Sequence, residues 1–512
     1  MLALVGAGAL LPTLAHVPPA AAESSRSGSV LTVGADLSGT ACGPIHFDPV
    51  QFTVATCYMA YDWPIYGGLL RLTPSGATVP DLAESVTVPD PQTIDVQLRP
   101  GVVFSDGTPF TADAVKAGLE RTIHTEHPAG FNAQLFDISG IDATGPRSLT
   151  LHFSQPVANT FYAQLADEES FIVSPTAVAD NVDLDTHPVG AGPFLLKSFV
   201  PGQRIVLVKN PRYWDAKAIK LPEVDFVNVP AGPQQVNALE SGLVQVVSGL
   251  PVSDLPAVRH NPSLHVQATS QDGNFLWLPI CKSSGPLADV RVRQALNYAT
   301  DRSAINKALL YGVGEPVWGL YPKGSRLFDR SLANIYAYNT SKAKQLLAAA
   351  GYARGFTTSI MPLPTPLDNQ LAQVLQAEWK KIGVNVQIMA TTNYVNDFYV
   401  RHLASMGLIS STRPGIQKVS GPYLPGSIGN ACSYSNPTLT QLVNQLGLLS
   451  PSSARYKPLW DQVQSFVIRN ALSVYVDFVP AVTAFSKRVT NLHTLPYLGG
   501  GLLDYRGVTL RG

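Results

Sequence analysis

Charged residues are scarce in this chain of 512 residues, of which they make up only 14%. Lys and Arg together number 36, as do Asp and Glu, so the formal net charge is zero. The basic stripe that marks a nucleic-acid-binding surface is therefore not expected, and we predict no nucleic-acid partner. Hydrophobic residues make up 45% of the chain, which is enough for a large core, and the length exceeds that of one ordinary domain.

Long apolar runs are missing after the first 22 residues, so no later segment is predicted to span a membrane. The N-terminal stretch MLALVGAGALLPTLAHVPPAAAES has no charge before Glu23 and ends in three alanines, which is typical of a secretory signal with a small-residue cleavage site. No Lys or Arg precedes the apolar run, so either the true start lies upstream or the signal is atypical. No Cys follows it directly, so no lipoprotein anchor is predicted. We expect a signal peptide over residues 1–22 and an exported chain in the periplasm or at the cell surface.

Cysteine is also scarce, with four residues, namely Cys42, Cys57, Cys281 and Cys432. Their spacing contains no CxxC pair and no Cys/His cluster of the kind that binds zinc. An even number of cysteines in an exported chain allows two disulfides, for which three pairings are possible. We expect Cys42–Cys57, which closes a short loop, with Cys281–Cys432 as the second bond.

Catalytic motifs are missing as well, since the chain has no HExxH, no P-loop and no GxSxG nucleophile elbow. The GAGPF segment at Gly190 lacks the third glycine and the following helix of a dinucleotide site. His124 and His127 form only a pair, whereas a metal site needs three or four ligands. The acidic run Asp167–Glu169 is interpreted as a solvated face. We therefore predict no catalytic residue, no metal and no cofactor.

Strand and helix patterns are what the sequence does contain. The alternation in TIDVQL (93–98) predicts a strand, and the Ser-Asp-Gly at 105–107 predicts a turn. Thr111 is expected to cap a helix in which Val115 and Leu119 share one face.

Further helices and strands follow in the second half of the chain. NTSKAKQLLAAAGY (339–352) predicts a helix with a Ser or Thr cap, and LDNQLAQVLQAEWKKIGVNVQI (367–388) predicts a helix, a stop at Gly383 and a strand. NFLWLPICKSSGPLADV (274–290) predicts an extended strand that crosses between two lobes. The alternation of helices and strands indicates an α/β protein.

The segment PDLAESVTVPDPQTIDVQLRPGVVFSDGTPFTADAVKAGLER (80–121) resembles the signature of the extracytoplasmic solute-binding proteins of ABC importers, in their oligopeptide, dipeptide and nickel class. The family's Leu-Ala-Glu-Ser and Leu-Arg-x-Gly-Val-x-Phe-x-Asp-Gly-Thr-Pro-Phe-Thr-Ala motifs are matched by residues 82–85 and 98–112. Other segments resemble the family in the same order, namely GAGPFLLKSFVPGQRIVLVKNPRYW, PLADVRVRQALNYATDR, YNTSKAKQLLAAAGY, the unit around Gly383 and YSNPTLTQLV. The likeness spans roughly residues 30–510.

The resemblance implies a two-lobed α/β fold of the type II periplasmic-binding-protein kind, with an extra α/β domain inserted in lobe 1. Ligand is expected between the lobes, which close about a hinge. The expected bounds are residues 29–68, 189–274 and 483–512 for lobe 1, 69–188 for the inserted domain and 275–482 for lobe 2. The function implied is capture of a peptide-like or other small polar solute by a monomer, and its delivery to the permease of an ABC importer.

One position departs from the peptide-binding members, in which an Asp of lobe 2 pairs with the α-ammonium of the peptide. In MGLISSTRPG, the register places Ser411 at that Asp and Leu408 in the aromatic position before it. An ammonium buried beside a Ser would lack its partner, and no Asp occurs between Asp397 and Asp461. An ordinary peptide is therefore in doubt. We expect a neutral or acidic ligand, with Arg413 either binding a carboxylate or phosphate or facing solvent.

The predicted ligand site combines this loop with aromatic and polar residues next to Gly, Pro or apolar strands. The predicted contacts are Thr53, Ala55, Tyr58, Trp277, Leu408, Ser411, Arg413, Tyr423 and Asn430. Two other classes of function stay open at this point. One is a secreted sensor or chaperone on the same scaffold, and the other is a secreted hydrolase, for which the sequence shows no acid/base pair.

Overall fold

The structure, a computed structural model, describes residues 30–38, 44–51, 55–125, 135, 137–411, 415–427, 429–495 and 502–511. At residues 55–58, 269–274 and 411 only the backbone is described. The predicted signal peptide, Cys42, Thr53 and Arg413 lie outside the described residues.

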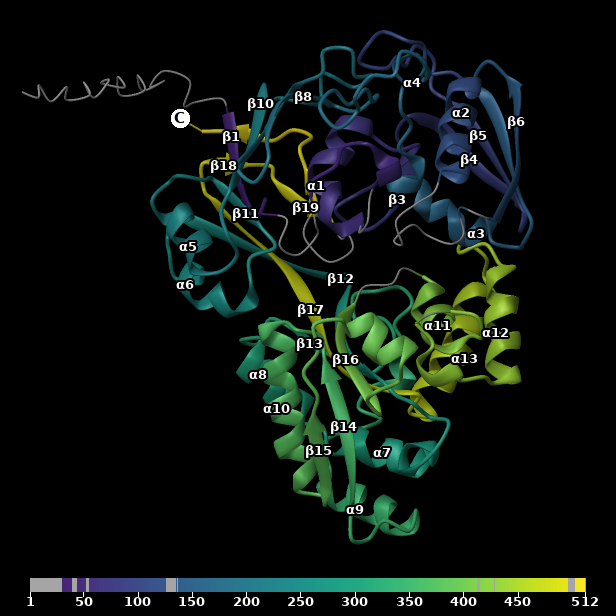
Figure 1. The fold of residues 1–512 in the computed structure, drawn as a ribbon, viewed down its shortest axis with the longest axis vertical. Coiled ribbons are helices and arrows are strands. Elements are labelled where there is room, and N and C mark those ends of the chain that lie inside the picture. The colour runs from purple at the N-terminus through teal and green to yellow at the C-terminus, as the bar shows by residue number, and fades with distance from the viewer. Residues whose placement is uncertain are drawn as a thin grey trace, which may run out of the picture.

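Two lobes make up the protein, and one mixed β-sheet continues through both of them (Figure 1). Its strand order is β15-β14-β16-β12-β17-β11-β1-β10-β9-β8, with β13 paired to β17. The strands are β15 (Val384–Ile388), β14 (Phe356–Pro362), β16 (Met406–Ser411), β12 (Leu264–Pro279), β17 (Ser473–Ser486), β11 (Val246–Ser248), β1 (Val30–Ala35), β10 (Glu223–Asn228), β9 (Arg204–Lys209), β8 (Phe194–Val200) and β13 (Glu315–Pro316).

The long strands β12 and β17 pass from one lobe to the other and pair antiparallel (Figure 1). Their register shifts between Thr269 and Asn274, which marks an irregularity in the middle of the crossing. On one side of it, Leu264 and Val482 pack in an upper-lobe core, whereas Leu276 on the other side packs in a lower-lobe core. The two lobes therefore have separate hydrophobic cores and share these two strands.

The expected crossover strand is present, but it begins at Leu264, ten residues before the position that its own sequence pattern indicated. The strand starts earlier because its first residues pair with β17 through backbone hydrogen bonds. The periodicity of the local sequence does not reveal such a partner. The lobe boundaries predicted at residues 274/275 and 482/483 fall inside the two crossing strands and stay predictions.

The inserted region of the upper lobe is a separate four-stranded sheet, ordered β4-β5-β7-β6, with α2 packed against it. The predicted cap of α2 is confirmed, because the Thr111 hydroxyl accepts a hydrogen bond from the Ala114 amide at 3.2 Å. Val115 and Leu119 are both fully buried, as expected. The elements of this region and its surroundings are α1 (Ala55–Tyr66), β2 (Leu70–Leu72), β3 (Thr78–Pro80), β4 (Ala83–Asp90), β5 (Thr93–Leu98), α2 (Ala112–His124), β6 (Ile138–Gly145), β7 (Ser148–Phe153), α3 (Ala158–Phe161), η3 (Tyr162–Ala166), η4 (Glu168–Ser170) and α4 (Pro175–Ala179).

The lower lobe is built on the parallel strands β14, β15 and β16 with α10 beside them. The helix–Gly–strand prediction is confirmed, since Gly383 has a positive φ of 90° between α10 and β15. The cap of α9 was predicted one or two residues late, because Asn339 caps it by accepting from the Lys342 amide at 2.8 Å. The remaining helices of the described residues, in both lobes, are η1 (Pro49–Gln51), α5 (Pro233–Glu240), η5 (Val252–Asp254), α6 (Leu255–Arg259), η6 (Pro286–Ala288), α7 (Val290–Tyr298), α8 (Arg302–Leu309), η7 (Arg330–Leu332), α9 (Thr340–Ala349), α10 (Pro366–Lys380), η8 (Val395–Val400), α11 (Gln417–Tyr423), η9 (Ala431–Ser433), α12 (Pro437–Gly447) and α13 (Tyr456–Arg469).

After β17 the chain returns to the upper lobe, where it forms two small antiparallel pairs (Figure 1). These are β18 (Val489–Thr490) with β21 (Thr509–Leu510) and β19 (His493–Leu495) with β20 (Leu502–Asp504). In the part of the chain that the structure describes, none of the helices combines the length and the apolar character that a membrane crossing needs.

Candidate functional site

The facing surfaces of the two lobes are the candidate site that the sequence indicated. Strands β14 and β16 run parallel, and their carboxyl ends, together with α11, lie on the side of the lower lobe that faces the upper lobe (Figure 1). The lobes touch where the Asn159 side-chain amide on α3 donates to the Gly447 carbonyl at the end of α12, at 3.5 Å. We refer to these facing surfaces as the interlobe face.

Two of the predicted contacts, Trp277 and Tyr423, meet in one aromatic cluster of the lower lobe. The Trp277 ring stacks on Tyr475 with centroids 5.8 Å apart and an interplanar angle of 14°. The Tyr423 hydroxyl hydrogen-bonds the Ser473 hydroxyl at 2.7 Å and the Tyr475 hydroxyl at 2.6 Å. Both side chains are buried, and the hydrogen bonds of Tyr423 hold α11 against the crossing strand β17.

Two more predicted contacts, Leu408 and Asn430, are also buried. Leu408 packs in the core of the lower lobe on β16. Asn430 organises the loop after α11, because its amide donates to the carbonyls of Leu424 at 2.9 Å and Tyr434 at 2.7 Å. Its side-chain oxygen accepts from the Tyr434 amide at 3.0 Å. In this structure both residues shape the lower lobe, and their contact with a ligand stays a prediction.

The other predicted contacts are divided between the lobes. Ala55 and Tyr58 lie in the first turns of α1 in the upper lobe. Ser411 is the last residue of β16, where its backbone lies opposite Phe275 of β12. Thr53 precedes α1 by two residues, and Arg413 follows β16 by two residues. Both lie outside the described residues.

Sequence reasoning missed two buried lysines next to the aromatic cluster. Lys418 on α11 is fully buried, with its ammonium 5.4 Å from the ring centroid of Phe275 and 5.2 Å from that of Tyr321. The ammonium of Lys282 lies 4.7 Å from the ring centroid of Tyr434 and donates to the Ile280 carbonyl at 2.9 Å. An aromatic face stabilises a cation that has lost its water.

Burial, together with the nearby Arg293, lowers the pKa of Lys282 to about 7. No sequence signal identifies either lysine, because both lie in local contexts that are typical of exposed residues. Their aromatic partners come from distant segments. Together the two lysines place buried amino groups close to α11, and Lys282 loses its charge as the pH rises through about 7.

The upper lobe contains buried acids, and this corrects the interpretation of the run at 167–169 as a solvated face. Glu168 and Glu169 are only 5% and 4% exposed, and Asp62 on α1 is fully buried. Burial raises the pKa of Glu168 well above its ordinary value, and the neighbouring carboxyls add to this effect. Burial likewise raises the pKa of Asp62. These acids are buried because η4 packs against α1, a contact between segments far apart in the chain. The Ser170 hydroxyl in η4 donates to the Leu165 carbonyl and helps to hold η4 in this position.

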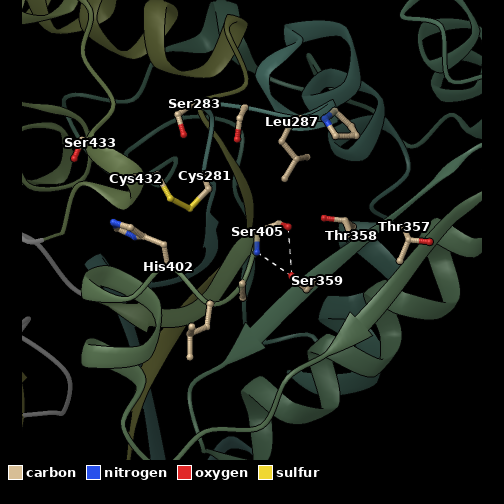
Figure 2. A pocket seen from close by; sticks show the side chains of 15 residues that line it. Cys281, Ser283, Leu287, Thr357, Thr358, Ser359, His402, Ser405, Cys432 and Ser433 are labelled. Carbon is tan, nitrogen blue, oxygen red and sulfur yellow. Dashed lines mark hydrogen bonds between the residues drawn. A yellow bond between two sulfur atoms is a disulfide. The ribbon is translucent and has the colours of Figure 1, made fainter.

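A pocket of about 570 Å³ opens elsewhere in the lower lobe (Figure 2). It lies beside the amino ends of β14 and β16, and thus at the opposite end of these strands from the interlobe face. The disulfide Cys281–Cys432 forms part of its wall, and it is the second of the two bonds that the sequence suggested. The pocket is lined by Cys281, Ser283, Ser284, Gly285, Pro286, Leu287, Thr357, Thr358, Ser359, His402, Leu403, Ala404, Ser405, Cys432 and Ser433.

Comparison with known proteins gives a consistent result. Residues 77–406 match the family model described as "Bacterial extracellular solute-binding proteins, family 5 Middle". The chain is 28% identical over 515 residues to heme-binding protein A of Haemophilus influenzae, and the match covers 92% of each of the two chains. It is 26% identical over 458 residues to glutathione-binding protein GsiB of Shigella flexneri serotype 5b, covering 86% of this chain and 88% of that protein.

One solved structure is similar to this chain in both sequence and fold. The binding protein AgaA from A. tumefacien R10, in complex with agropinic acid, is 26% identical and superposes with a TM-score of 0.76. The match covers 94% of this chain and 99% of AgaA.

Proposed function

The chain belongs to the bacterial extracellular solute-binding proteins of family 5, and from this premise we propose that it captures a small acidic solute between its lobes for an ABC importer. Members of the family act outside the cytoplasm as the substrate-binding components of such importers. Family membership by itself does not show three parts of this proposal. These are that the solute is acidic, that it binds between the lobes, and that the partner is the permease of an importer.

The observation that carries the proposal is the way in which the lobes are joined. Each lobe has its own hydrophobic cores, and the two crossing strands β12 and β17 connect them. The register shift at Thr269 and Asn274 interrupts the ladder of hydrogen bonds within the crossing. A bulge of this kind bends a strand locally, and separate cores allow two rigid bodies to move as units. Closure of the lobes about this place would enclose a solute.

The charge of the lower lobe supports an acidic ligand. Between Asp397 and Asp461 the sequence contains no Asp or Glu, but it does contain Arg413 and Lys418. Lys418 lies over the ring of Phe275, whose backbone is opposite Ser411 at the end of β16, and Arg413 follows that end by two residues. A solute ammonium placed at Ser411 would lack an anion, whereas a carboxylate would find cationic partners. By its printed name, the ligand of AgaA is an acid.

Native mass spectrometry of the protein purified from the exported fraction tests this proposal. We expect a co-purifying small molecule with a net negative charge, and calorimetry should then reproduce its binding to ligand-free protein. Tight binding of unmodified peptides with a free amino terminus, with no binding of acidic solutes, would contradict the ligand class but not the solute-binding function. Loss of any solute binding in correctly folded protein would contradict the function itself.

We also propose that the exported chain begins at Glu23, acts as a monomer and has no catalytic activity of its own. The uncharged apolar start with its three alanines supports processing at that point. N-terminal sequencing of exported material checks the start, and light scattering of the same material checks the oligomeric state. Retention of Met1 in exported protein would exclude the processing.

A further inference from the structure

Two cysteines and one histidine come together on the wall of the pocket in the lower lobe (Figure 2). The sulfur atoms of Cys281 and Cys432 and a ring nitrogen of His402 all lie within 4.8 Å of one another. Cys281 follows β12, His402 follows η8, and Cys432 lies in η9, so three separate segments converge here. In the structure the two sulfurs are joined as a disulfide.

The imidazole of His402 is oriented by a backbone group. Its Nδ1 lies 3.2 Å from the Phe398 carbonyl oxygen one turn earlier. If Nδ1 carries the proton and donates it to that carbonyl, Nε2 keeps its lone pair. Histidines that bind metals usually show this arrangement, in which one ring nitrogen donates to a carbonyl or carboxylate and the other binds the ion. This ring is therefore already prepared to act as a ligand.

The three groups are accessible from the pocket. Cys281 and Cys432 are half-buried and His402 is exposed, and all three line the cavity of about 570 Å³. A thiol reductant can therefore approach the disulfide, and the pocket has room for a water molecule beside the three side chains. Ser283 and Ser433 also line this pocket (Figure 2).

We propose that reduction of Cys281–Cys432 turns this cluster into a Zn²⁺ site in which Cys281, Cys432 and His402 are the protein ligands and a pocket water is the fourth. A dithiol reductant supplies two electrons, so that the protein disulfide becomes two thiols and the dithiol becomes a disulfide. Binding of Zn²⁺ then releases the two thiol protons to solvent. Two thiolates and an imidazole favour Zn²⁺ over hard cations, and a set of three protein ligands with one open position is a common zinc geometry.

The distances between the ligand atoms can be compared with those of a zinc site. A tetrahedral zinc site has Zn–S distances of about 2.3 Å and Zn–N distances of about 2.0–2.1 Å, which keeps its ligand atoms roughly 3–4 Å apart. The His402 nitrogen already lies within 4.8 Å of both sulfurs, whereas the two sulfurs, now bonded to each other, have to move apart after reduction. The ion would then replace the disulfide as the tie between the end of β12 and the loop after α11. The inference is independent of the solute proposed for the interlobe face.

Cobalt absorption spectroscopy tests the site. Full-length protein is reduced with dithiothreitol, freed of reductant under anaerobic conditions and titrated with Co²⁺, a spectroscopic stand-in for Zn²⁺. We expect one equivalent of Co²⁺ to produce a thiolate-to-metal charge-transfer band that Zn²⁺ abolishes by displacement. Oxidised protein should give no such band. His402→Ala should weaken Co²⁺ binding at least about tenfold, because loss of a metal ligand should cost no less than loss of a supporting partner.

Two variants separate the site from unspecific binding. Cys281→Ser should remove most of the charge-transfer intensity and the tight affinity. His260→Ala changes an exposed histidine after α6 and should leave the titration unchanged. The proposal is overturned if the reduced protein shows no thiolate band, if His402→Ala titrates like the wild type, or if circular dichroism shows that reduction unfolds the protein.

Discussion

Arg506 and Asp81 form a buried ion pair although 425 residues separate them. The Arg506 Nη2 atom donates to the Asp81 carboxylate oxygens at 3.2 and 3.3 Å. Asp81 is fully buried, and it also accepts hydrogen bonds of 3.0 Å from the Tyr213 hydroxyl and the Trp214 indole. The last segment of the chain therefore completes the upper lobe only after the chain has passed through the lower lobe and returned along β17.

Arg506→Ala should destabilise the protein by about 3–5 kcal/mol, because it leaves the Asp81 carboxylate buried without its cation. Urea unfolding followed by circular dichroism measures the loss. Arg488→Ala is the matched control, since the guanidinium of this exposed arginine in the same C-terminal region donates to the Arg511 carbonyl at 3.1 Å and pairs with no carboxylate among the described residues. Its effect should stay within about 0.5 kcal/mol. Equal effects of the two substitutions would show that the Asp81 pair is not important for stability.

Asp477 on β17 should make the stability of the protein depend on pH. Burial, to which the charge of Glu315 adds, raises the pKa of this carboxyl from 3.8 to about 7, although hydrogen bonds from Asn306 and from the Glu315 backbone and the charge of Arg302 oppose the shift. The folded protein then holds a proton that the unfolded chain has already released between about pH 4 and 7. The contribution of this group therefore falls as the pH rises through that window.

Asp477→Asn removes the titrating group and can keep the contact with the Asn306 amide, which donates to Asp477 at 2.9 Å, through its side-chain oxygen. Relative to wild type, the free energy of unfolding of the variant should therefore rise between pH 4.5 and 8, by on the order of 3 kcal/mol. Chemical denaturation at a series of pH values measures both curves. Parallel curves over that range would exclude Asp477 as the source of the pH dependence.

The disulfides can be mapped by digestion without reduction. We expect peptides linked through Cys281–Cys432 and, as a prediction from the sequence, through Cys42–Cys57. Replacing Cys281 and Cys432 together by Ala should destabilise the protein by about 2–5 kcal/mol, because the bond closes a segment of 151 residues in the unfolded chain. Free thiols at Cys42 and Cys57 in exported protein would contradict the first linkage.

Arg413→Ala should weaken the binding of an acidic solute by roughly 2–5 kcal/mol if the guanidinium forms a buried pair with the solute's carboxylate or phosphate. Isothermal titration calorimetry measures the change. Arg401→Ala is the control, because Arg401 is exposed and pairs with Asp397 one helical turn away. Unchanged affinity in Arg413→Ala would place this side chain in solvent, which is the alternative that the sequence left open.

Local features of the fold were predictable because a few neighbouring residues decide them. The cap at Thr111 and the buried face of Val115 and Leu119 follow from side-chain chemistry within one or two helical turns. The same reasoning found the helix of residues 340–349 but missed its cap, because Asn339 provides the same hydrogen bond as a Ser or Thr. The predicted cap position is therefore wrong by one or two residues, while the predicted helix is correct.

Features that depend on distant partners could not be predicted in this way. The first part of β12, Leu264–Thr269, is a strand because β17 pairs with it, and the buried position of Glu168 and Glu169 depends on the packing of η4 against α1. Trp277 and Tyr423 were predicted as ligand contacts for their aromatic character. The structure packs them against Tyr475, which comes from the returning strand.

The sequence by itself determined the family and the local patterns of helices and strands, because motifs and composition are properties of the chain. That Ser411 replaces an acidic anchor is a prediction from the same motifs. Only the tertiary structure decided which charges are buried and with which partners. Arg506 reaches Asp81, and His402 approaches Cys281 and Cys432, through contacts between segments far apart in the chain. Burial and electrostatic coupling depend on distance in space, and local sequence patterns do not contain that distance.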